Sequence, residues 1–156
     1  MADHAHQRIL EAVQAALVAA ATAAGSRVYL DRVDDLPAAN LPAIDILGAD
    51  DIGEDAIEYQ TVHFPGVQRH AYSFAIRSVT ALATGSAKAA RNLAGQVEAA
   101  LLAAANTVAV GGKSIDLLLS DSSEIKDGAG ALPMFAVRQT WQAQFMTVGG
   151  APTVPA

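Results

Sequence analysis

Apolar residues recur every three or four positions in two parts of the chain, the spacing that places side chains on one face of an α-helix. The first part runs from Asp3 to Ala24, and its apolar stripe is made of Ile9, Val13, Ala16, Leu17 and Ala20. Asp3 is a suitable N-cap for this helix and Gly25 a suitable stop. The second part, 86–105, has its stripe at Ala90, Leu93, Val97, Ala100, Leu101 and Ala104. We therefore predict two amphipathic helices.

Elsewhere the apolar residues alternate with polar ones or form short β-prone runs, which predicts strands. Short strands are expected at 27–30 and 43–47, and Gly111-Gly112 marks a turn into a further strand at 113–119. Pro65-Gly66 predicts a hairpin joining 59–64 to 67–82. In its second arm Tyr72, Phe74 and Ile76 face one way and Arg69 and Arg77 the other. The clearest strand is 134–148, where Phe135, Val137, Trp141, Ala143 and Phe145 alternate with Arg138, Thr140, Gln142 and Gln144.

Four segments lack either period and are expected to be loops or tails. Between the two short strands, Leu36-Pro37 and Leu41-Pro42 predict a stiff, extended connection, because proline fixes φ and moves the preceding residue away from helical geometry. Its two leucines are expected to anchor it to the core. The acidic stretch 50–58 is expected to be a mobile loop, 120–130 a polar loop, and 149–156 a flexible C-terminal tail.

These elements predict an α+β fold with a mostly antiparallel sheet and two helices packed on one face, in the order helix, strands, helix, strands. At 156 residues the chain suits one domain, placed at 1–148. The residues are 52% hydrophobic but only 5% aromatic, so the core should be filled mainly by Ala, Val, Leu and Ile.

Charge and composition exclude several classes of protein. The net charge of -6 argues against binding nucleic acid through its phosphates, which needs clustered Lys and Arg. The absence of cysteine excludes disulfides and thiolate metal sites. The chain starts without a basic segment before an apolar run and has no run of about 18 apolar residues. We therefore expect a soluble protein made inside the cell, with no membrane partner.

Residues with catalytic or ligand-binding chemistry form no recognisable site. "VGGKS" has Thr107 where a phosphate-binding loop needs its first glycine, and a strand rather than a helix is predicted to follow. His4 and His6 diverge on a helix, while His63 and His70 could face each other across the hairpin without a third ligand. The acids of 50–58 lack the spacing of a calcium loop. We predict no catalysis, no cofactor and no metal.

Three parts of the chain resemble the tail terminator, or tail completion, proteins of long-tailed bacteriophages and related gene transfer particles. They are Val28-Tyr29 with Arg32 and Leu36-Pro37, then Leu41-Pro42-Ala43-Ile44, and later Ser123-Glu124-Ile125 leading towards the final strand. The likeness covers about Gln7 to Val148. The segment 59–74 is longer than is typical of the family, and its Pro65-Gly66 tip looks like an insertion.

The resemblance implies a hexameric ring that caps the head-proximal end of the tail tube, ends its polymerisation and meets a head-side connector. It implies assembly in the host cytoplasm, a place in the virion, and DNA passing through the channel without specific binding. Candidate protein-contact residues are Tyr29, Arg32, Leu36, Pro37, Arg69 and Arg77. Two alternatives remain open: another neck component, such as a head-tail connector or head-closure protein, and a small ligand-binding or enzymatic α+β domain.

Overall fold

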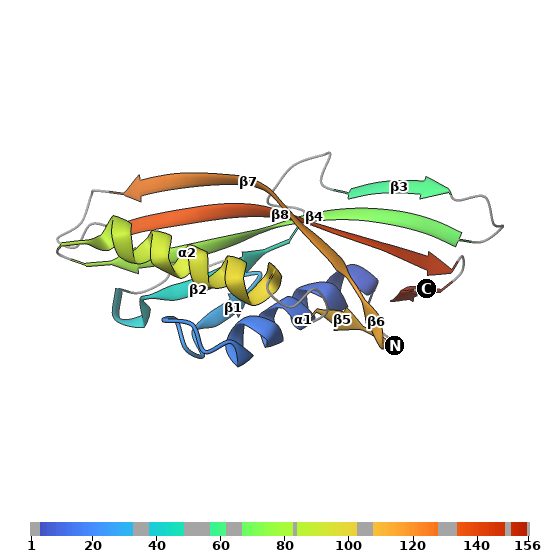
Figure 1. Cartoon of the computed structure of the whole chain (residues 1–156), viewed down its shortest axis with the longest axis horizontal. Helices are drawn as coiled ribbons and strands as arrows, with labels where there is room; N and C mark the ends of the chain where they lie inside the picture. The colour runs from blue at the N-terminus through green and yellow to red at the C-terminus, as the bar shows by residue number, and fades with distance from the viewer. Residues whose placement is uncertain are drawn as a thin grey trace.

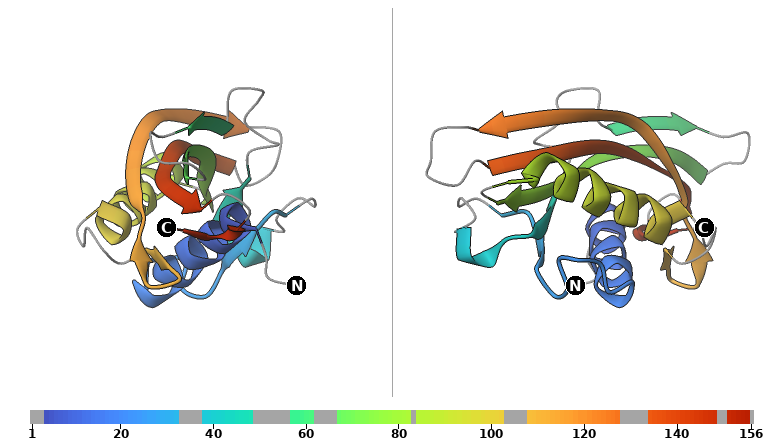
Figure 2. Two further views of the ribbon diagram at one scale, coloured as in Figure 1. Left: turned by 90° about the vertical axis from the view of Figure 1, so that its right-hand side faces the viewer. Right: turned by 60° about the vertical axis from the view of Figure 1, so that its left-hand side comes forward.

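The computed structural model describes residues 4–32, 38–48, 57–61, 67–82, 84–102, 108–127, 134–148 and 151–155. Both helices lie on the same side of a long curved sheet (Figures 1 and 2). They are α1 (Ala5–Ala19) and α2 (Ser86–Leu102). No helix within the described ranges has the length and apolar character needed to cross a membrane.

Two fifteen-residue strands, β4 (Val67–Ala81) and β8 (Met134–Val148), form the centre of the sheet. They pair antiparallel along their full length, from Val67 opposite Val148 to Ala81 opposite Met134. The sheet order is β1-β2-β4-β8-β7, with β3 also paired to β4 and β9 to β8. The remaining strands of this sheet are β1 (Val28–Leu30), β2 (Ala43–Leu47), β3 (Ile57–Thr61), β7 (Asp116–Asp127) and β9 (Ala151–Pro155).

The sheet is mixed rather than wholly antiparallel, because β1 and β2 run parallel to each other. A parallel neighbour needs a crossover connection of about a dozen residues, and the segment 31–42 supplies it. The short 3₁₀ helix η1 (Ala38–Asn40) lies in this connection, so the connection is not simply extended as predicted. Leu41 is half-buried beside it and lies outside the set of buried core residues.

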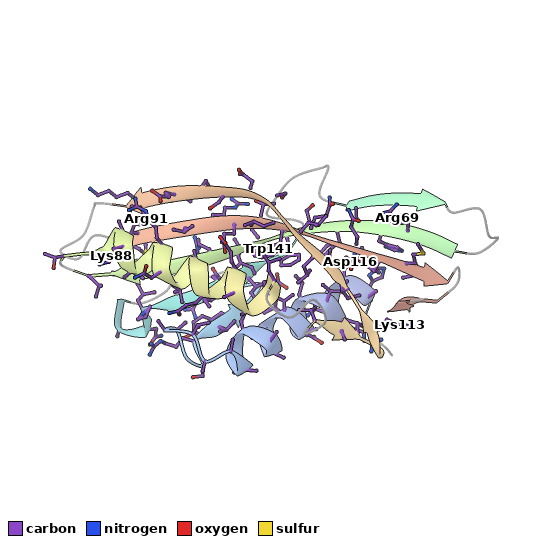
Figure 3. The ribbon with its side chains drawn as sticks, viewed as in Figure 1. Arg69, Lys88, Arg91, Lys113, Asp116 and Trp141 are labelled. Carbon is purple, nitrogen blue, oxygen red and sulfur yellow. The ribbon has the colours of Figure 1, made fainter. Side chains whose placement is uncertain are left out.

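The core lies between the sheet and the two helices and joins all the main elements in one cluster. Trp141 and Phe74 are its largest fully buried side chains, and Ile9, Leu17 and Leu93 bring the helices onto them. Figure 3 shows Trp141 between β8 and the helices. The predicted alternation of β4 and β8 is therefore confirmed, with one added feature: Gln139 is fully buried on the core face between Val137 and Trp141.

Helix α1 is shorter than predicted. It begins after His4, whose side chain accepts a hydrogen bond from the His6 amide, and it ends at Ala19 rather than near Gly25. Gly25 instead has a φ of 59° in the turn before β1, a left-handed conformation that glycine adopts without strain. The predicted N-cap, Asp3, lies outside the described residues.

Strand β7 is longer than predicted, because the supposed polar loop from Ser120 continues the strand to Asp127. Its residues 120–126 are all exposed and include Ser and Asp, which have low strand propensity. Pairing with β8 holds them in the strand, with a register shift between Leu119 and Asp121. The expected C-terminal tail likewise contains β9, which pairs with the end of β8.

The remaining predictions concern turns. β3 and β4 form the predicted hairpin, and Thr61 lies opposite Gln68. Gly111 and Gly112, with φ of 59° and 76°, join β5 (Ala109–Val110) to β6 (Lys113–Ser114) as the tight turn predicted in place of a phosphate loop. Most of the acidic stretch lies outside the described residues, although Glu58 belongs to β3.

Candidate interaction surface

The sheet has a second surface, which we call the open face: the side of the sheet opposite α1 and α2. Neither helix lies on it (Figure 2). One row crosses it from edge to edge and consists, in register, of Tyr29, Asp45, Arg77, Arg138 and Ser123. All five side chains are charged or carry a hydroxyl group, which suits a contact surface. The adjacent row of the same face, Ala43, Val79 and Ala136, is apolar and buried.

The middle of this row is held by an ion pair between neighbouring strands. The Arg77 Nη2 atom on β4 donates to Asp45 Oδ2 on β2 at 2.8 Å. The Asp45 side chain is only 1% exposed, whereas that of Arg77 is 37% exposed. Arg77 thus neutralises the buried carboxylate of Asp45. The carboxylate in turn offsets the charge of Arg77, which weakens the repulsion between Arg77 and Arg138 directly opposite it.

The predicted contact residues divide into two groups. Tyr29 and Arg32 come together at the β1 edge, where the Arg32 guanidinium lies 5.0 Å from the centre of the Tyr29 ring, and Arg77 belongs to the same row. Arg69 lies elsewhere on β4, exposed beside β3, and donates to Gln144 of β8 at 3.3 Å. In Figure 3, Arg69 lies towards one end of the sheet, and Lys88 and Arg91 of α2 lie towards the other end. Leu36 and Pro37 lie outside the described residues.

Sequence reasoning missed the outer edge of the sheet along β7. This strand pairs with β8 on one side and with no other strand among the described residues. Its C-terminal half is tied to α2 by a bidentate ion pair, Arg91 Nε to Glu124 Oε1 at 2.6 Å and Arg91 Nη2 to Glu124 Oε2 at 2.9 Å. The hydrogen bond to Arg91 lowers the pKa of Glu124. Leu118 and Ile125, 49% and 46% exposed, lie on this strand.

Sequence reasoning also missed a cluster of aromatic and histidine rings where α1 begins. His6 stacks on Tyr72 with ring centres 4.4 Å apart, and its Nε2 atom is 3.2 Å from Nδ1 of His70. His70 is fully enclosed, stacks on Phe145, and has its Nε2 atom 2.7 Å from the Thr147 hydroxyl. Burial is the main cause that lowers the pKa of His6 to about 4, and it also lowers the pKa of His70.

The burial of His70 was readable from the sequence, because it occupies the same strand parity as Tyr72, Phe74 and Ile76. Its partner was not, since contact with His6 spans 64 positions. The prediction that His63 faces His70 is wrong, because the register places Tyr59 opposite His70. His63 itself lies outside the described residues. No group of three or more metal-ligating side chains occurs in the described part of the chain.

The hollows among the described residues are lined mainly by apolar side chains. One, of about 300 Å³, lies at the start of β7 and is lined by Leu101, Leu102, Val108, Ile115, Asp116, Leu117, Leu118 and Gln144. Another, of about 510 Å³, lies along alanines of α1 with Ala100 and Ala109. Neither combines the converging polar groups that orient a small substrate.

Comparison with known proteins gives a likeness of fold. No protein-family model matches the chain, and no curated protein matches it. A chain in the solved structure entitled "Virion of native gene transfer agent (GTA) particle" superposes with a TM-score of 0.55. The match covers 92% of this chain and 96% of that chain, at 17% identity. The two chains therefore share the α+β fold over nearly their whole lengths.

Proposed function

We propose that this protein is a structural component of a phage-like particle and acts as a tail terminator. In this role it forms a ring, hexameric by resemblance, at the head-proximal end of the tail tube. The ring stops polymerisation of the tube and presents a surface to the head-side connector. It assembles in the host cytoplasm and stays in the virion, and the protein is not an enzyme.

The observation that carries the proposal is the likeness of fold to a chain of a gene transfer agent virion over almost the full length of both chains. Tail terminators are also the family that the sequence resembles at Val28-Tyr29, Leu41-Pro42 and Ser123-Glu124-Ile125. The two comparisons support the same class of protein.

The surface chemistry supports assembly more than catalysis. A protein that works in a ring needs exposed strand edges and faces that fit its neighbours, and the described residues provide a long edge at β7 and a polar open face. The net charge of -6 suits a channel through which DNA passes without being held by its phosphates. The tail tube protein and the head-side connector are the proposed partners.

A capping experiment tests the proposal. Purified tail tube protein is polymerised with and without this protein, and tube lengths and tube ends are measured by negative-stain microscopy. We expect shorter tubes with a ring at one end only. Binding to portal rings but not to tubes assigns the protein to the head-side part of the neck, and binding to neither overturns the assembly role.

A further inference from the structure

We infer that neighbouring subunits of the proposed ring meet through opposite edges of the sheet, with the β7 edge of one copy against the β1 edge of the next. The β7 edge comprises the outer side of Asp116–Asp127, and the β1 edge comprises β1 with its flanking residues, 26–32. The partner at each edge is a second copy of this chain, so the inference rests on the proposed function. The two edges are the two ends of the strand order β1-β2-β4-β8-β7.

The β7 edge has the properties of a surface that needs a cover. It is twelve residues long and contains no proline, and its pairing with β8 leaves its outer side without a partner strand among the described residues. Proteins normally protect such an edge by keeping it short, by placing charged residues, proline or a bulge on it, or by covering it with another element. Of these devices β7 has charged residues, among them Lys126, but neither proline nor a short length. The β7 edge has a single irregularity, between Leu119 and Asp121.

Its exposed side chains include apolar and hydroxyl groups, carboxylates and one lysine, Lys126. Leu118 and Ile125 pair in register with Gln142 and Ala136, which places both on the open-face side. Each is almost half exposed and can therefore contribute apolar area to a contact. Between and beside them lie the exposed carboxylates of Asp121 and Asp116, which form no ion pair with any described residue.

The β1 edge carries two arginines and one exposed aspartate, Asp31, so its net charge is positive. Arg27 and Arg32 flank the three-residue strand, one on each side. The Arg27 Nε atom donates to the Pro42 carbonyl at 2.8 Å, and Arg32 lies over the Tyr29 ring, so local contacts fix both guanidinium groups near this edge. Gln14 donates to the Val28 carbonyl at 2.9 Å, which occupies one backbone acceptor of the strand. We therefore expect side chains, rather than an extended ladder, to make the contact.

Charge also selects the arrangement of the two copies. Two β7 edges related by a two-fold axis at Asp121 would bring the Asp121 carboxylates of both copies together, which like-charge repulsion disfavours. A β7 edge against a β1 edge instead sets the carboxylates of Asp116 and Asp121 against Arg27 and Arg32. Each copy then uses one edge for each neighbour, and such a heterologous contact closes into a ring when the rotation fits.

Cysteine cross-linking tests the pairing directly, because the native chain has no cysteine. Ser123→Cys places a thiol on the β7 edge and Ser26→Cys places one beside Arg27, both at exposed positions and with little change in size. The two single variants are mixed in equal amounts, under conditions where rings form, and treated with a short bis-maleimide. Lys88→Cys, exposed on α2, is the control.

We expect a covalent dimer in the mixture of Ser123→Cys with Ser26→Cys, and little with either variant alone or with Lys88→Cys. Strong cross-linking of Ser123→Cys to itself overturns the inference in favour of a two-fold contact between β7 edges. Absence of the mixed dimer, in a sample that forms rings or caps tubes, also overturns it while leaving the proposed function intact. If the wild-type protein forms no ring and caps no tube, the proposed function itself is wrong.

A charge exchange provides the second measurement. Asp121→Arg and Arg32→Asp should each raise the protein concentration needed for ring assembly by about tenfold. The double variant should recover most of this loss, because the pair is restored with its signs reversed. Each variant is first checked for an unchanged unfolding midpoint. Additive losses in the double variant contradict the proposed contact between the two edges.

Discussion

The two faces of β4 and β8 differ sharply although they belong to the same strands. Successive residues point to opposite sides, so fully buried Trp141 follows half-buried Thr140, and Phe74 follows Ser73. The core face holds the helices, whereas the open face carries a polar row that includes Asp45, Arg77 and Arg138. The comparison indicates that substitutions on one face should change stability and those on the other should change assembly.

The open face is itself uneven, and this qualifies the comparison. Ala75 and Val79 on the C-terminal half of β4 are buried, together with Asp45 beside them on β2. Arg69, towards the other end of β4, is exposed. Contact residues are therefore expected among the exposed positions of this face, while the part around Asp45 contributes to folding.

The largest effect is expected on the core face. Trp141→Ala removes the largest fully buried side chain and should lower the free energy of unfolding by about 3–5 kcal/mol. Thr140→Ala, on the other face one residue earlier, should change it by about 0.5 kcal/mol or less. Urea denaturation followed by circular dichroism measures both. Similar losses for the two variants would contradict the separation of the faces.

The next effect separates two arginines that sequence analysis grouped together. Arg77→Ala leaves the buried Asp45 carboxylate without its 2.8 Å partner, so we expect a loss of about 1–3 kcal/mol. Arg69→Ala removes an exposed guanidinium and should leave the unfolding midpoint unchanged while weakening assembly. Denaturation and sedimentation of both variants measure this. Equal stabilities would show that Arg77 does not support Asp45.

A smaller effect depends on pH. The folded pKa of His6 is about 4, below its ordinary 6.5, because the ring is largely buried. Between these values the unfolded chain takes up a proton that the folded chain does not, so stability is complete above pH 6.5 and falls towards pH 4. Solvent reaches part of the ring, and we expect a loss of about 1–2 kcal/mol.

His6→Phe removes the titrating group and keeps a ring beside Tyr72. Its free energy of unfolding should therefore vary less between pH 7 and pH 4.5 than that of the wild type, as measured by urea denaturation at several pH values. An unchanged slope in His6→Phe would contradict the assignment of the pH dependence to this ring.

The smallest effect concerns the ion pair between α2 and β7. Both side chains of Arg91 and Glu124 are about half exposed, at 56% and 46%, so solvent screens the pair and it should contribute little to stability. A double-mutant cycle with Arg91→Ala and Glu124→Ala measures the coupling, which should shrink in high salt. A coupling that is large and insensitive to salt would show that this edge is more enclosed than the exposed side chains indicate.

The spacing of apolar residues predicted the strands that have one buried face. β2 and β8 match their predicted bounds, because an alternating or continuous apolar run marks a strand with a buried face. The part of β7 beyond Leu119 differs from the loop predicted there, because an exposed edge strand lacks the apolar alternation that indicates a strand. The parallel pairing of β1 with β2 and the contact of His6 with His70 depend on which distant segments meet, information that neither period nor spacing carries.

The most direct test of the assembly role is the solution mass of the purified protein by light scattering over a concentration series, with negative-stain images of the same samples. We predict a closed ring of defined mass, either free at high concentration or on the ends of added tail tubes. A protein that stays monomeric at every concentration, and remains unbound when tubes are added, would contradict its proposed place at the end of the tail.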